Sequence, residues 1–100
     1  MTRYVIDASA AAEYLLRTSL GLEIADVIEA AILLAPELLD VEVLSVLRRA
    51  VLRRKLDERR AVLALEDLAD WQIDRISHIG LIQPACWHRH NMSAYDAFGF

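Results

Sequence analysis

The sequence is poor in residues that cross-link the chain or interrupt secondary structure. Its 100 residues include one cysteine, two prolines and three glycines. The single cysteine, Cys86, excludes an internal disulfide, fits a reducing cytoplasm and is expected to serve as a small buried apolar residue. Because few residues favour turns, we expect one domain of long elements, most of them helical.

The chain also lacks a long apolar segment and an excess of positive charge. Its longest apolar run, residues 30–36, is too short to cross a bilayer, and Asp7 follows only three apolar-type residues, which leaves no signal-peptide core. The formal net charge is −4, so a nucleic-acid ligand would require a local basic patch. We therefore expect a cytoplasmic protein without a membrane segment.

Hydrophobic residues are abundant and make up 56% of the chain. Globular proteins usually contain about 45–50%. The excess indicates either large core helices or a surface for self-association or a partner. The candidates for such a surface, with core burial as the competing account, are Leu15, Leu16, Leu20 and Ile24.

Hydrophobic patterning predicts alternating strands and helices. Short apolar runs favour strands over residues 4–6, 32–34 and within 72–77. Helical spacing predicts helices over residues 8–17, from residue 19, over 36–56, over 58–71, near 84–90 and from residue 93. This order favours an α/β fold in which helices flank a small parallel sheet.

Capping residues predict several helix boundaries. Asp7 or Ser9 would cap the first helix and Asp57 the fourth, because short polar side chains accept hydrogen bonds from the first free N–H groups. Pro36 fits the first turn of the third helix, and Asn91 fits a left-handed stop after the fifth. An apolar series with helical spacing marks the third helix: Leu38, Val41, Leu44, Leu47, Val51 and Leu52.

Three carboxylates are candidate metal ligands. Asp7 ends the first strand, at the edge of a parallel sheet where ligands bind. Glu42 lies in the third helix among apolar neighbours, where an unpaired charge would be costly and a cation would relieve that cost. Asp96 begins the last helix. If the three converged, Mg²⁺ would remove their repulsion and activate water for phosphodiester hydrolysis.

Alternatives remain open for each of these acids on the residues alone. Asp7 would be only a helix cap, and acids on helices are usually solvated. Asp40 would lend a supporting carboxylate near Glu42, but it lies on a different helical stripe and is expected instead to be solvated.

Three segments, "YVIDASAAAEYLL", "APELLDVEVLSVLRR" and "NMSAYDAFGF", resemble in order the acid-bearing segments of the PIN domain, and of VapC-type toxins most closely. The resemblance implies a single PIN-like α/β/α sandwich over residues 1–100 and an endoribonuclease toxin that uses Mg²⁺ or Mn²⁺. It implies that the catalytic metal ligands are Asp7, Glu42 and Asp96, with Ser9 supporting the site. It also implies an RNA substrate, an inhibiting antitoxin and a homodimer.

The resemblance has one departure, because VapC-like chains continue past the "SAYDA" segment with a further strand and a further acid. We therefore expect a C-terminally truncated domain that lacks its last strand and has a weakened metal site. One alternative is a catalytically impaired PIN-like module that binds antitoxin or dimerises. Another is a Mg²⁺-dependent phosphoesterase that uses the same acids on DNA.

A basic cluster lies at the C-terminal end of the third helix and extends beyond it, and about 15 Å of helix separates it from Glu42. Its cationic side chains would contact RNA phosphates, or they would form ordinary ion pairs with Asp57, Glu58 and Glu66. The cluster consists of Arg48, Arg49, Arg53, Arg54, Lys55, Arg59 and Arg60.

Overall fold

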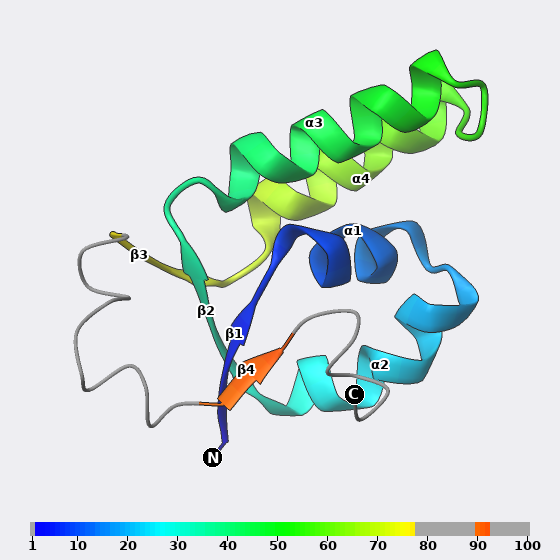
Figure 1. The fold of residues 1–100 in the computed structure, drawn as a ribbon. Coiled ribbons are helices and arrows are strands. Elements are labelled where there is room, and N and C mark those ends of the chain that lie inside the picture. Colours follow the sequence, from blue (N-terminus) through cyan, green and yellow to red (C-terminus); the bar gives the residue numbers. More distant parts are fainter. Residues whose placement is uncertain (1, 78–89, 93–100) are drawn as a thin grey trace.

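The computed structural model describes residues 2–77 and 90–92, and within them strands alternate with helices (Figure 1). The elements are β1 (Arg3–Ile6), α1 (Ala8–Leu16), α2 (Ser19–Ala30), β2 (Ile32–Pro36), α3 (Leu39–Leu52), α4 (Glu58–Asp70), β3 (Asp74–Ile76) and β4 (His90–Met92). The predicted order of three strands and four helices up to residue 76 is confirmed.

The strands form one parallel sheet in the order β3-β2-β1-β4. Val5 pairs with Leu34 of β2, and Ile6 pairs with Met92 of β4. Since every pairing is parallel, the carboxyl ends of the strands meet at one edge. The predicted α/β class with a small parallel sheet is confirmed, and the architecture is consistent with a PIN-like fold.

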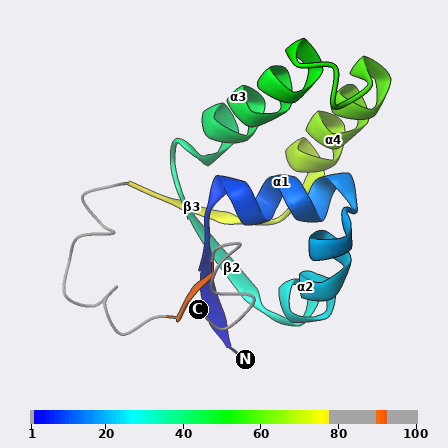
Figure 2. The ribbon, with the colours of Figure 1, turned by 45° about the vertical axis from the view of Figure 1, so that its right-hand side comes forward.

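The helices pack around α1, which contacts α2, α3 and α4. Both ribbon views show α3 and α4 side by side as a hairpin whose connecting turn lies far from the sheet (Figures 1 and 2). Ile6, Leu39, Val43 and Leu47 are the largest fully buried side chains, and they join β1 to α3 in the core. The described residues contain no helix long and apolar enough to cross a membrane.

Small residues let α1 and α2 approach each other closely. Gly21 is buried, and a Cβ atom at this position would collide with the backbone carbonyl of Glu13 in α1. Thr18 stabilises the same corner, because its hydroxyl caps α2 by accepting from Gly21 N at 3.0 Å and also bonds to the Glu13 carboxylate. The glycine is therefore required by the close approach of the two helices.

Two predicted helix boundaries are wrong. Pro36 ends β2 instead of starting a helix, because it pairs with Ile76 of β3, and α3 begins three residues later. Asn91 lies in β4 and is not a left-handed helix stop. Asp57 holds the predicted N-cap position of α4, but its side chain makes no capping hydrogen bond.

Several predicted elements fall outside the described residues. These are the body of the fifth helix (84–89), including Cys86, and the last helix from residue 93. The prediction that the domain lacks its last strand also falls outside the described residues and is not tested by them.

The apolar residues of α3 divide between two faces. Leu39, Val43 and Leu47 face the core, whereas Leu38 and Val41 are about 60% exposed. The other large apolar side chains exposed in the described part are Leu22, Val27, Leu44, Leu52, Val62 and Leu63.

The predicted interaction surface on the first two helices is largely part of the core. Leu15 and Ile24 are buried, and Leu16 and Leu20 pack against the core with partial exposure. The competing account of these residues, core burial, is therefore correct for Leu15 and Ile24.

Candidate active site at the carboxyl edge of the sheet

Asp7 connects the sheet to the first helix. It follows β1 directly, has an extended backbone and caps α1 by accepting from Ala10 N at 2.9 Å through Oδ1. Ser9, the other predicted cap, is exposed within the first turn. The cap uses one carboxylate oxygen, and no donor from the described residues bonds to Oδ2. Asp7 can therefore cap the helix and still offer an oxygen to a ligand.

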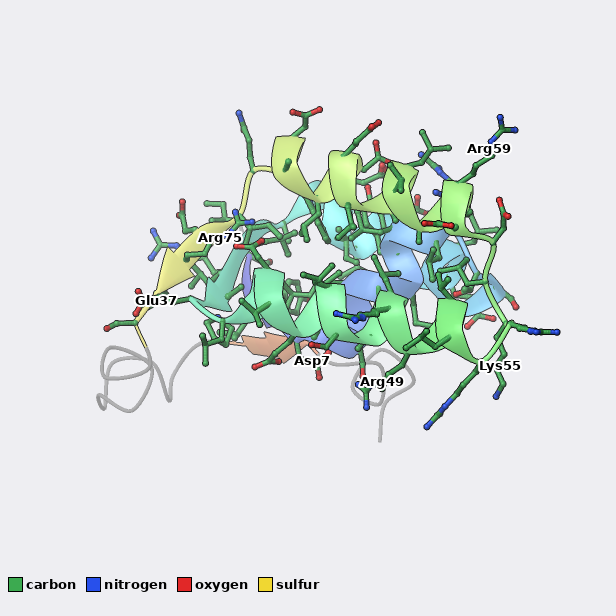
Figure 3. The ribbon with its side chains drawn as sticks, turned by 90° about the horizontal axis from the view of Figure 1, so that it is seen from above. Asp7, Glu37, Arg49, Lys55, Arg59 and Arg75 are labelled. Carbon is green, nitrogen blue, oxygen red and sulfur yellow. The ribbon has the colours of Figure 1, made fainter. Side chains whose placement is uncertain are left out.

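Three segments that are distant in the sequence meet at the edge where Asp7 lies. Because Val5 pairs with Leu34, Asp7 is level with the end of β2, from which a short turn leads into α3. Because Ile6 pairs with Met92, β4 also ends beside Asp7. Figure 3 shows Asp7 next to α3 and to β4. The chain thus brings the start of α3 and the end of β4 to Asp7.

Glu42 lies in the first turn of α3, where its N–H donates to the carbonyl of Leu38 at 2.9 Å. Its side chain is exposed, so the expectation that it faces apolar surroundings and needs a cation to offset burial is wrong. The positive end of the helix dipole favours a carboxylate at this position without any ligand. Its exposure nevertheless leaves the side chain open to a ligand.

An ion pair ties the first turn of α3 to β3. Arg75 donates to both carboxylate oxygens of Asp40, with Nη2–Oδ1 at 2.7 Å and Nε–Oδ2 at 3.3 Å, and also to the carbonyl of Ile73 at 2.8 Å. Asp40 is exposed, as predicted, but the prediction did not include its ion pair with Arg75. Sequence spacing gave no signal for this pair, because the partners are 35 positions apart.

The described residues fit a hard divalent cation in part. Asp7 and Glu42 are carboxylates, and Mg²⁺ commonly uses one or two carboxylates together with water. Asp96, the third predicted ligand, lies outside the described residues. Within residues 2–77 and 90–92, no group of three histidine, cysteine or acidic side chains is close enough to hold a metal. The donor chemistry therefore fits the metal, and the complete set of ligands stays a prediction.

The basic cluster has few partners. Arg60 is half-buried and donates to the carbonyl of Leu15 at 2.8 Å, and Arg49 donates to the carbonyl of Ser45 at 3.4 Å. Asp40–Arg75 is the one ion pair in the described part of the chain, so the predicted pairs to Asp57, Glu58 and Glu66 do not form.

An aromatic pair lies at the other end of α1 from Asp7. Tyr14 stacks on Trp71 with ring centroids 4.9 Å apart, beside a 210 Å³ cavity that Arg17 and Asp67 also line. Burial raises the pKa of the Tyr14 hydroxyl above its ordinary value of 10.0, and the nearby carboxylate of Glu29 raises it further. This cavity is separate from the carboxyl edge.

The fold and this edge define a small α/β protein with acidic side chains at the carboxyl end of a parallel sheet. Comparison with known proteins narrows the class. The chain is 34% identical over 99 residues to Ribonuclease VapC1 of Mycobacterium tuberculosis strain CDC 1551 / Oshkosh, a match that covers 97% of this chain and 74% of the relative. Ribonuclease VapC1 of strain ATCC 25618 / H37Rv matches to the same extent. The chain belongs to the VapC ribonuclease family.

No protein-family model and no solved structure matches the sequence. The similarity to VapC1 ribonucleases supports the predicted VapC-type resemblance. The assignment to the PIN domain rests only on the resemblance of the three acid-bearing segments and on the fold class.

Proposed function

We propose that this protein is a toxin endoribonuclease that hydrolyses RNA phosphodiester bonds. The observation that carries the proposal is the match with Ribonuclease VapC1, which extends over 97% of the chain. The fold is compatible with it, because the acidic residue after β1 lies at the edge where parallel α/β sheets bind ligands.

Asp7, Glu42 and Asp96 are proposed to bind Mg²⁺ or Mn²⁺. Asp7 supports this role because α1 fixes its carboxylate and leaves Oδ2 available. Asp96 follows the end of β4 by four residues, which span at most about 14 Å of extended chain. A divalent cation bound here would polarise the phosphate and lower the pKa of a bound water. Ser9, two residues after Asp7, stays a proposed supporting residue.

Antitoxin binding and a homodimer are proposed from the family resemblance. The apolar side chains that α3 and α4 expose are available for such contacts in the described part, with Leu38 and Val41 the most exposed near Glu42. A second candidate function is a PIN-like module that binds its partner without cleaving RNA. It is favoured by the large apolar side chains that α3 and α4 expose in the described part of the chain.

The substitution Asp7→Asn tests the nuclease proposal. Asparagine keeps an oxygen that can cap α1 but removes the negative charge, so stability should change by only a few tenths of a kcal/mol. We expect cleavage of RNA by the purified protein in Mg²⁺ to fall at least about 100-fold, since loss of a charged ligand removes metal affinity. Calorimetric titration with Mg²⁺ should show the same weakening.

Asp57→Asn is the matched control, because Asp57 occupies the equivalent N-cap position of α4 away from the carboxyl edge. It should leave Mg²⁺ affinity unchanged and should not reduce cleavage. Growth arrest on expression should disappear with Asp7→Asn and persist with Asp57→Asn. Arrest that persists in both variants, together with the absence of RNA cleavage, would favour the binding module over the nuclease.

A further inference from the structure

The charges of this chain are strongly segregated. Seven of the eleven cationic residues fall within residues 48–60, which contain only two acids, so this segment has a formal net charge of +5. The other 87 residues contain four cations and thirteen acids, a net charge of −9. The chain therefore contains a local cationic region despite its net charge of −4, and this region favours the binding of a polyanion.

The cationic region is concentrated at the turn between α3 and α4. Six side chains form it, and we call them the basic tip: Arg48, Arg49, Arg53, Arg54, Lys55 and Arg59. All six are exposed, whereas Arg60 is half-buried and bonded to Leu15. Figure 3 shows Lys55 and Arg59 extending outward at the end of the hairpin that is remote from Glu37 and Arg75, with Arg49 on α3 before that end.

The basic tip is not neutralised by the described part of the protein. None of its six cations forms an ion pair with an acid in the described part of the chain, although Asp57 and Glu58 are close in the sequence. Gathering like charges without counter-ions costs free energy through mutual repulsion, and binding a polyanion would relieve that cost. Five of the six are arginines, whose guanidinium groups match phosphate geometry with two parallel hydrogen bonds.

The basic tip lies within reach of an RNA that occupies the proposed active site. Arg53 is eleven residues from Glu42, which is about 16 Å along the chain if counted at helical rise. A nucleic-acid strand with a charge every ~3.4 Å covers that distance with roughly five nucleotides. A strand held at the carboxyl edge could therefore follow α3 to the turn.

We propose that the basic tip binds the phosphate backbone of RNA several nucleotides away from the bond that is cut. The inference rests on the proposed function for its substrate class. It adds a binding surface outside the carboxyl edge. This surface binds the RNA backbone without recognising the bases. An RNA is favoured over an acidic protein because the tip offers dispersed arginines, which suit a regular row of phosphates.

The test is the salt dependence of RNA binding, measured without cleavage. A fluorescent single-stranded RNA of about 20 nucleotides is titrated with the Asp7→Asn protein in EDTA, and anisotropy is followed at several KCl concentrations. Arg49→Gln with Arg53→Gln removes two tip charges, and Arg3→Gln with Arg17→Gln removes two exposed charges elsewhere. The two double variants change the net charge equally, so they separate a local contact from a general electrostatic effect.

The tip variant should reduce the slope of log K against log salt by about 1.4, because each single-strand phosphate contact contributes about 0.7. At 0.1 M salt this corresponds to a loss of about 25-fold in affinity. The control variant should keep most of the slope. Thermal unfolding of both variants should match that of the parent, since these side chains are exposed.

Two outcomes would overturn the inference, a third would support it, and a fourth would separate it from the proposed function. Equal slopes for the tip and control variants would overturn it. Binding of polyglutamate that depends on the tip, with RNA binding unaffected by the same substitutions, would overturn it in favour of an acidic protein ligand. Single-stranded DNA that binds with the same tip-dependent slope supports backbone recognition. The assay uses neither metal nor cleavage. If the protein binds RNA through the tip but never cuts RNA, only the proposed function is refuted.

Discussion

Residues at the junctions between β1 and α1 and between α1 and α2 each have two roles. Asp7 caps α1 with one oxygen, and no donor from residues 2–77 or 90–92 bonds to the other oxygen at the carboxyl edge. Thr18 caps α2 while its hydroxyl also contacts Glu13 of α1. At this scale, sequence reasoning was correct about the cap at Asp7 because capping depends only on the next three residues.

Gly21→Ala should destabilise the protein. In an ordinary helix interior this change stabilises by about 0.5–1 kcal/mol, but here the new Cβ would meet the Glu13 carbonyl, so we expect a loss of about 1–3 kcal/mol. Urea unfolding followed by circular dichroism measures it. Ser19→Ala, an exposed change in the same helix, is the control and should be nearly neutral. A stabilised Gly21→Ala protein would show that α1 and α2 do not approach this closely.

Tyr14 should make stability fall at alkaline pH. Its pKa is higher in the folded than in the unfolded protein, so the neutral form is favoured on folding. That contribution is complete below pH 10 and is lost as the pH rises through the higher, folded pKa. The free energy of unfolding, measured between pH 8 and pH 11.5, should therefore decrease less in Tyr14→Phe than in the parent. Identical pH profiles would refute this role.

At the scale of elements, the position of α3 follows from contacts at both of its faces. Leu39, Val43 and Leu47 bury its inner face, and the Asp40–Arg75 pair attaches its first turn to β3. The same helix carries Glu42 at the carboxyl edge and begins the basic tip at its other end. One packed helix thus sets the distance between the two proposed RNA contacts.

The Asp40–Arg75 pair should contribute measurable coupling. A double-mutant cycle with Asp40→Asn and Arg75→Gln should give about 0.5–1 kcal/mol, near the upper end for exposed pairs because the geometry is bidentate. Breaking the pair should also speed hydrogen exchange at the Glu42 amide, which bonds to Leu38. Asp26→Asn, which removes an exposed acid of α2, should alter neither the coupling energy nor the hydrogen exchange of the Glu42 amide. A coupling near zero would mean that the pair does not hold the start of α3.

At the scale of the whole molecule, the sequence and the comparisons agree on the class of protein. The three acid-bearing segments point to a VapC-type chain, and 34% identity to Ribonuclease VapC1 places it in that family. The molecule is also electrically divided, with the basic tip at one end of the α3–α4 hairpin and the acidic Asp7 and Glu42 near the other. This division would orient the substrate, because a polyanion is attracted to the basic tip and needs a bound cation beside Asp7 and Glu42.

The sequence by itself determined the order of elements over residues 3–76 and the location of Asp7 at a strand end. It could do so because helices, strands and caps depend on interactions within a few positions of the chain. Only the tertiary structure decided that Glu42 is exposed, that Pro36 ends a strand, and which apolar stripe of α3 faces the core. It also decided that Asp40 pairs with Arg75, while the basic tip forms no ion pair with any acid among residues 2–77 and 90–92. These features depend on which segments pack together across long sequence distances, and α3 carries apolar residues on both faces, so local periodicity could not choose between them.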